Sequence, residues 1–336
     1  MGSFRVNKMF VNFVHENQNF DMTITSLISP IRHFSRNILA SLILFSIYLG
    51  GSLSVRAQDL LVDVPVPPES ILRLDERCNY IVDNFWKHLN FKSAFSSLDK
   101  MDATLGQFIA VTPYATADTV FAAVDFLIKG VEKADAKNLL QLARMAEKWC
   151  GSDTAEYASE ELMLPFANAV VNSKKIKNGP DKQHYALMAK RISNSRTGVV
   201  PADFAFTVPD GTQAHFSEVK QPAVLLFFYD PDNFESRLAR TRLGSDYVIK
   251  TLAQHDLLKV VAIYPGEASQ AWLDDIASMP DNWVIGAAPG IENDFRILSY
   301  PQLYYLDENR VITDKDFSVD TAIRYFGQFL QGTNHN

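Results

Sequence analysis

The fold is decided by the stretch Ala223-Val-Leu-Leu-Phe-Phe-Tyr-Asp-Pro-Asp-Asn-Phe-Glu-Ser236. Its apolar part, Val224 to Tyr229, is a short uninterrupted run of the type that is buried in the centre of a sheet. Polar residues follow, and a helical pattern then continues from Phe234 to about Gln254. A buried strand that leads directly into a helix is typical of an α/β domain.

Strands and helices alternate on both sides of this stretch, over residues 198–336. Before it, residues 199–213 show a strand-like alternation that is broken by a Pro-Asp-Gly turn. After it, the pattern predicts strands at 259–264, 283–287, 302–306 and 310–313, and helices at 269–279, 291–295 and 319–330. This order predicts a mixed sheet with helices on both faces.

Residues 58–197 show a different pattern, because their apolar residues recur at helical spacing. Within 71–91, for example, Leu74, Cys78 and Ile81 fall on one face of a helix. Further helices are predicted at 120–131, 139–149, 155–171 and 180–195. We therefore expect an all-helical domain over 58–197, followed by the α/β domain over 198–336.

Residues 1–57 are interpreted as an N-terminal extension with a signal peptide. The apolar run Asn37–Leu49 follows basic residues and precedes a small-residue cleavage site that ends at Ala57. The run has about 13 residues, fewer than the roughly 20 that a membrane-spanning helix needs. We therefore predict export to the periplasm with cleavage between Ala57 and Gln58, and a retained anchor is the alternative. The start is either Met1 or Met22, and the second would leave a signal of ordinary length.

The charge and the motifs exclude several classes of function. The formal net charge of −7 makes nucleic acid or an anionic membrane a poor match as a partner. No zincin, P-loop, dinucleotide-binding or G-x-S-x-G motif is present, so we predict no cofactor and no metal. The acidic pairs Glu160-Glu161 and Asp274-Asp275 are interpreted as solvated surface. The sequence makes no prediction about the oligomeric state.

Four features of residues 199–332 are informative together: the order of the elements, the start Pro201-Ala-Asp-Phe204 with its later Asp-Gly turn, the strand end Leu226-Phe-Phe-Tyr-Asp-Pro-Asp232, and Ser299-Tyr-Pro-Gln-Leu-Tyr-Tyr-Leu306. In these features the region resembles the thioredoxin-like superfamily, and in particular its exported thiol-disulfide interchange and peroxiredoxin-related branch. The helical domain is similar to that of a bacterial family of unassigned function. The resemblance implies a thioredoxin-like fold for residues 198–336.

The positions of the family's C-x-x-C motif are occupied by Asn233, Phe234, Glu235 and Ser236. A thioredoxin-type reaction needs one thiolate to attack a disulfide and a second thiol to resolve the intermediate. Residues 199–336 contain no cysteine, so a peroxiredoxin reaction is also excluded there. Asn233 is a strong N-cap, and Asp232 with Glu235 has the spacing of a capping box, so we interpret the loop as a structural replacement. Recognition of an anion by the helix N-terminus is the alternative, and the acidic neighbours oppose it.

The resemblance also implies a cis peptide bond between Tyr300 and Pro301, beside the former active site. In the family, the backbone just before this proline pairs with extended polypeptide. Ser299, Tyr300 and Pro301 are therefore a candidate peptide-binding edge. The alternative is that Pro301 only stabilises the fold.

The chain has two cysteines, Cys78 and Cys150, and both lie in the helical domain. Export permits a disulfide between them, whereas their apolar settings favour two free, packed thiols.

The sequence as a whole leaves two candidate functions. The first is a non-catalytic exported protein that binds or positions a polypeptide partner. The alternative is a thiol-disulfide oxidoreductase or peroxiredoxin-related enzyme that uses Cys78 and Cys150, or the thiols of a partner chain.

Overall fold

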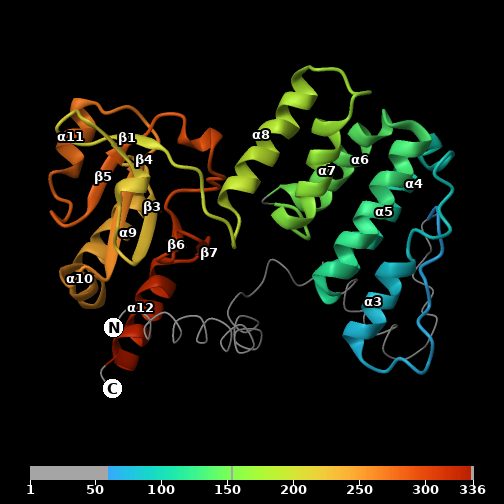
Figure 1. Ribbon diagram of the computed structural model, residues 1–336, viewed down its shortest axis with the longest axis horizontal. Helices are drawn as coiled ribbons and strands as arrows, with labels where there is room; N and C mark the ends of the chain where they lie inside the picture. Colours follow the sequence, from blue (N-terminus) through green and yellow to red (C-terminus); the bar gives the residue numbers. More distant parts are fainter. Residues whose placement is uncertain (1–59, 153, 334–336) are drawn as a thin grey trace. The chain divides into compact units, whose positions relative to one another are not determined.

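The computed structural model describes residues 60–152 and 154–333 (Figure 1). The predicted signal peptide, its cleavage site and the alternative start at Met22 lie outside these residues. Within the described part of the chain, no helix is both long enough and apolar enough to cross a membrane. Contacts divide the chain into two compact units: one runs to Leu89 and includes Asp99–Ala123, and the other combines Asn90–Leu98 with everything from Val124 onward.

The first unit is helical. It contains α3 (Leu74–Asn84), most of α4 (Leu98–Val111), the short η4 (Thr112–Tyr114) and the beginning of α5 (Ala117–Asp135). Its core includes an aromatic cluster in which the ring centroids of Phe85 and Phe108 lie 5.4 Å apart. Of the helix predicted at 71–91, only the central part forms, as α3. The helix α4 was not predicted, because the buried face of α4 includes Thr104 and Gly106 beside the apolar residues.

The helices of the second unit follow in a regular series before the sheet. They are the end of α5, α6 (Asn138–Ala146), the π-helical η5 (Glu147–Gly151), α7 (Glu160–Asn172) and α8 (Pro180–Ser195); the short η3 (Ala94–Ser96) also belongs to this unit. The predicted helix at 155–171 begins later, at Glu160, because the Ser159 hydroxyl accepts a hydrogen bond from the N–H of Leu162 at 3.2 Å and caps the helix there.

The sheet has the strand order β2-β1-β5-β4-β3-β6-β7. Its strands are β1 (Ala205–Thr207), β2 (Gln213–His215), β3 (Ala223–Phe228), β4 (Leu258–Tyr264), β5 (Val284–Ala287), β6 (Gln302–Leu306) and β7 (Ile312–Lys315). The central strand β3 pairs in parallel with β4 and antiparallel with β6. The mixed sheet predicted from the alternating pattern is therefore confirmed.

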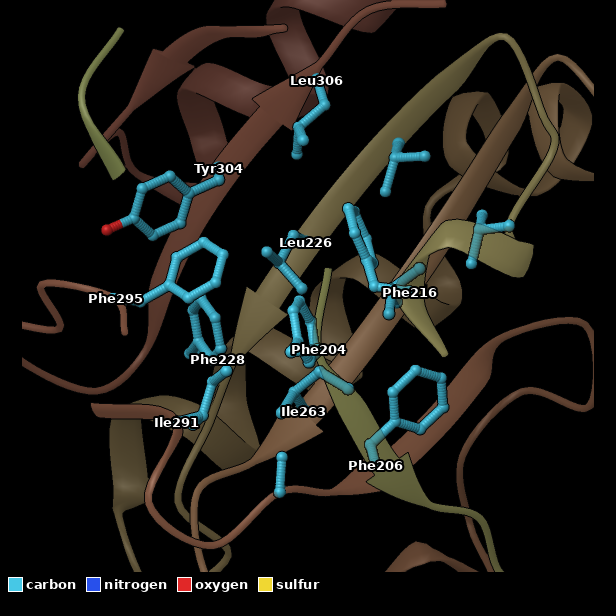
Figure 2. Close-up of a cluster of buried hydrophobic side chains, with 14 of the residues drawn as sticks. Phe204, Phe206, Phe216, Leu226, Phe228, Ile263, Ile291, Phe295, Tyr304 and Leu306 are labelled. Atoms are coloured by element: carbon cyan, nitrogen blue, oxygen red, sulfur yellow. The ribbon is translucent and has the colours of Figure 1, made fainter. Parts of the chain in front are cut away.

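Both faces of β3 are buried, as its uninterrupted apolar sequence predicts. On one face, Figure 2 shows Phe228 beside Phe295 and Tyr304, with ring centroids 5.2 and 5.8 Å from that of Phe228. This face is covered by residues that include η6 (Phe216–Glu218) and η7 (Ile291–Asn293). Toward the other face, Tyr305 of β6 packs on Phe326 of α12 (Val319–Thr333) at 5.5 Å. The predicted fold class, α plus α/β, is confirmed.

One long predicted helix is in fact two. The segment 234–254 forms α9 (Phe234–Ser245) and α10 (Tyr247–Gln254), and α11 (Gln270–Ile276) follows after β4. Asp246 separates α9 from α10, because its backbone is extended and its side chain accepts a hydrogen bond from the N–H of Ile249 at 3.0 Å. The helical period continues across this break, so periodicity alone does not reveal it.

Candidate functional site

The candidate site lies where β3 and β4 end. Because these strands are parallel, their carboxyl ends share one edge of the sheet. The chain leaves β3 at Phe228, crosses the loop Tyr229–Asn233 and enters α9 at Phe234. On the other side of β3, Phe228 pairs with Gln302, so the segment before β6 lies next to this loop. The altered C-x-x-C positions and the Tyr300–Pro301 bond are therefore neighbours.

Asn233 and Ser236 have structural roles in this loop. The side chain of Asn233 is the N-cap of α9, and its Oδ1 accepts a hydrogen bond from the N–H of Ser236 at 2.9 Å. The Ser236 hydroxyl in turn accepts from the N–H of Asp230 at 3.2 Å, and the residue is only 1% exposed. Of the two caps considered in the sequence, the N-cap is therefore Asn233 and not Asp232. Both polar groups satisfy the main chain of the loop that contains them.

The other two positions face solvent. Phe234 is 66% exposed, and Glu235 is also exposed. Leu238, one helical turn after Phe234, is 43% exposed. The first two turns of α9 therefore present an apolar surface, Phe234 with Leu238, at the edge that carries the candidate site.

The peptide bond between Tyr300 and Pro301 is cis. The Tyr300 hydroxyl donates a hydrogen bond to the carboxylate of Glu292, and Ser299 is exposed. Burial of the phenol raises the pKa of Tyr300, and the hydrogen bond to Glu292 and the charges of Glu292 and Asp230 raise it further. Among the described residues, no hydrogen bond joins the main-chain N–H or C=O of Ser299 or Tyr300 to the rest of the protein.

Two further residues line this edge that the sequence did not single out. Tyr264 ends β4, and burial together with the charges of Asp230 and Asp232 raises its pKa. Gln302 begins β6 and is 4% exposed, and its side-chain N–H₂ donates to the C=O of Arg296 at 3.0 Å and to the Tyr304 hydroxyl at 2.9 Å. A single glutamine after a proline gives no sequence signal for such a role.

Among the described residues of the thioredoxin-like domain, neither histidine lies close enough to Ser236 to act as a base. His215 lies in β2, four strand positions from β3, which is roughly 19 Å at the usual spacing between strands. It pairs with Asp203, with the His215 Nδ1 and a carboxylate oxygen 3.0 Å apart. His255 precedes β4 and so lies near the opposite end of that strand. Among the described residues, no group of three or more His, Cys, Asp or Glu side chains has the arrangement of a metal site.

Cys78 and Cys150 are both free and buried. The disulfide that the sequence left open is not formed, because each thiol is packed within its own unit, Cys78 on α3 and Cys150 in η5. The Cys150 thiol donates to the C=O of Ala146 at 3.2 Å. Burial raises the pKa of Cys150 to about 12, and burial followed by the charge of Asp75 raises that of Cys78. Neither has the properties of a reactive thiolate.

Comparisons with known proteins bear on the fold of the chain. Residues 52–195 match the family model described as "Domain of unknown function (DUF5106)". A thioredoxin-like protein from Bacteroides caccae ATCC 43185 is similar in structure, with a TM-score of 0.62 and 18% identity over 79% of this chain and 97% of that chain. None of the curated proteins matches this chain.

Two other solved structures match the chain over a shorter part of its length. A conserved protein of unknown function from Bacteroides fragilis is 28% identical over 39% of this chain and 98% of that chain, with a TM-score of 0.37. A thiol:disulfide interchange protein from Bacteroides sp. is 14% identical over 41% of this chain and 92% of that chain, with a TM-score of 0.37. The family model and the Bacteroides caccae structure together confirm the predicted resemblance: the chain joins a helical segment that matches DUF5106 to a C-terminal domain with the thioredoxin-like fold.

Proposed function

We propose that this is an exported, non-catalytic protein whose thioredoxin-like domain binds an extended segment of a polypeptide partner. The binding surface combines the edge Ser299–Pro301 with the apolar pair Phe234 and Leu238. One observation carries the proposal. The positions of the two thiols are occupied by a helix cap and a buried hydroxyl, while the main chain beside them remains free for pairing.

The absence of redox chemistry follows from the residues at the loop. Disulfide exchange requires sulfur at both positions, and an amide and an alcohol cannot form the mixed disulfide. Ser236 is 1% exposed and already hydrogen-bonded to the main chain of Asp230. A buried serine without a neighbouring base is also a poor nucleophile.

The affinity for a peptide would come from two kinds of contact. The main chain of Ser299 and Tyr300 offers hydrogen-bonding groups to an extended strand, which supply affinity without regard to sequence. Phe234 offers a large apolar side chain that a partner can cover, and burying it supplies about 1.5–3 kcal/mol at full burial. Acidic groups at the same edge, including Asp232 and Glu235, would favour a peptide without acidic residues near them.

No observation favours the alternative, an oxidoreductase that works through Cys78 and Cys150. Both thiols are buried with raised pKa values, whereas a catalytic thiol is accessible and has a lowered pKa.

The proposal of export is supported by the sequence of residues 1–57. The intact mass of the protein secreted from its expression host tests export, because cleavage before Gln58 would shorten the chain by residues 1–57.

The test of binding uses the full chain and a displayed library of short random peptides. We expect enriched extended sequences whose affinity for Phe234→Ser falls about tenfold, equivalent to about 1.4 kcal/mol. Tyr247→Ser is the matched control, because Tyr247 is an aromatic residue with 77% exposure that begins α10, beyond the far end of α9. The 12 residues of α9 alone span roughly 18 Å along the helix axis. Equal losses in both variants, no enriched peptide, or reduction of insulin disulfides by the wild-type chain would contradict the proposal.

A further inference from the structure

A buried carboxylate in the helical part of the second unit holds two cations of the thioredoxin-like domain. Glu160, in the first turn of α7, is 7% exposed, and both of its oxygens are paired. Oε1 lies 2.5 Å from Nη1 of Arg296, and Oε2 lies 2.5 Å from Nζ of Lys315. The side chains of these two cations are only 18% and 11% exposed. The interpretation of Glu160 as solvated surface is therefore wrong, whereas its neighbour Glu161 is exposed as expected.

The ion pair is one of several contacts that fix Arg296. Its Nη2 donates to the C=O of Gly151 at 3.2 Å, and its main-chain N–H donates to the hydroxyl of Ser195 at the end of α8 at 3.2 Å. Nearby, the side-chain amide of Asn194 donates to the C=O of Asp294 at 3.1 Å. The chain is thus held by the helices at the point where it approaches the candidate peptide-binding edge.

Hydrogen bonds continue from Arg296 to the far end of the 296–302 segment. The C=O of Arg296 accepts from Nε2 of Gln302 and from the Tyr304 hydroxyl, the latter at 2.7 Å. The Oε1 of Gln302 accepts from the N–H of Leu298 at 2.6 Å. Its Nε2 also lies 2.6 Å from a carboxylate oxygen of Asp316, next to Lys315, so its two protons are shared among three acceptors. Residues 297–301 therefore span two anchored positions, Arg296 and Gln302.

Between these anchors, the side chains of Ile297 and Tyr300 pack against the core and the Tyr300 hydroxyl donates to Glu292. The segment is weakly held only at Leu298 and in the main chain of Ser299 and Tyr300. Leu298 is 39% exposed, Ser299 is exposed, and the main chain of Ser299 and Tyr300 makes no hydrogen bond to another described residue. A buried ion pair is a weak source of stability, because desolvation offsets the attraction, but its geometry is exacting. An ion triad at one end of a segment whose main chain lacks hydrogen bonds is suited to setting the path of that main chain.

We propose that Glu160 is a positioning residue for the peptide-binding edge. Through Arg296 and Gln302 it fixes the path of Leu298, Ser299 and Tyr300, so the helices of the second unit preorganise a surface on the thioredoxin-like domain. The role of that surface rests on the proposed function, but the positioning itself does not. Preorganisation matters for a backbone-pairing site, because a segment that is ordered in advance loses less entropy on binding.

The test compares Glu160→Gln with its exposed neighbour Glu161→Gln in the full chain. The glutamine keeps the size of the side chain and removes the charge that holds both cations. Amide hydrogen exchange by NMR reports on the segment through Arg296 and Leu298, whose N–H groups bond to Ser195 and Gln302. We expect exchange at both amides to accelerate about tenfold and the amide shifts of Ser299 and Tyr300 to move in Glu160→Gln alone.

Unchanged exchange at Arg296 and Leu298 would overturn the proposal. So would equal acceleration across β3 and β4, which is the result of a general loss of stability. Arg296→Lys provides a milder variant that folds more safely: it keeps the charge and loses the planar fork that reaches both Glu160 and Gly151. It should accelerate exchange at the same two amides to a smaller extent. Because no peptide is present in this experiment, its outcome is independent of whether the edge binds one.

Discussion

At the scale of single residues, two polar side chains stabilise the candidate loop. Asn233 caps α9 through the N–H of Ser236, and Ser236 accepts from the N–H of Asp230. The two side chains together satisfy main-chain groups on both sides of the loop. Local polar contacts at these two positions therefore stabilise the turn between β3 and α9.

This role predicts the effect of removing the cap. Asn233→Ala should lower the free energy of unfolding of the thioredoxin-like domain by about 1 kcal/mol, because the N–H of Ser236 loses its acceptor. Asp232→Ala is the control, since Asp232 precedes the cap, is exposed and should change stability little. Urea unfolding followed by tryptophan fluorescence measures both. A larger loss in Asp232→Ala would place the cap one residue earlier.

Only local features of these residues could be predicted from the sequence. The cap at Asn233 was one of two predicted alternatives, because Asx residues at helix starts have a local signature. Glu160 was misjudged because its partners Arg296 and Lys315 are 136 and 155 residues away. An acidic residue in the first turn of an amphipathic helix is usually solvated. Only the tertiary structure brings two cations to this one and leaves its neighbour Glu161 in solvent.

At the scale of elements, strands were predicted more accurately than helix ends. The apolar runs that became β3 and β4 are buried on both faces and therefore have an unmistakable pattern. Helix ends depend on single polar residues instead. Ser159 delays the start of α7, and Asp246 divides one predicted helix into α9 and α10, while the apolar spacing continues past both. Periodicity detects helices, but caps decide their limits.

The break at Asp246 leads to a prediction of its own. Asp246→Ala should destabilise the domain by about 1 kcal/mol and speed exchange at the amide of Ile249, which loses its capping oxygen. Asp246→Asn keeps an acceptor at the same place and should remain close to wild type. Urea unfolding and amide exchange give the two readouts. Equal destabilisation by alanine and asparagine would show that the charge of Asp246, rather than the cap, maintains the break.

At the scale of the whole molecule, the two units do not coincide with the change from helices to strands. The second unit contains helices α6 to α8 together with the entire sheet. The contacts of Glu160, Asn194 and Ser195 with residues 294–315 explain this grouping. A family model that ends at residue 195 therefore ends within a compact unit.

The two cysteines provide one reporter for each unit, since Cys78 lies in the first and Cys150 in the second. Both thiols are buried, so we expect slow reaction with a thiol reagent in native buffer and rapid reaction of each when its own unit unfolds in urea. Intact mass counts the modified thiols, and peptide mapping assigns them. Rapid reaction of either thiol in native buffer would contradict the structural role and revive the oxidoreductase alternative.

The thiol of Cys150 also predicts how stability depends on pH. Its pKa is raised by burial from 9.0 to about 12, so above pH 9 the unfolded chain loses a proton that the folded chain keeps. Its contribution is fully present below pH 9 and is lost progressively as the pH rises toward 12. Urea midpoints at pH 8 and pH 10 should therefore differ more in wild type than in Cys150→Ala, where this group is absent. An equal difference in both proteins would mean that Cys150 is not a buried, protonated thiol in the folded state.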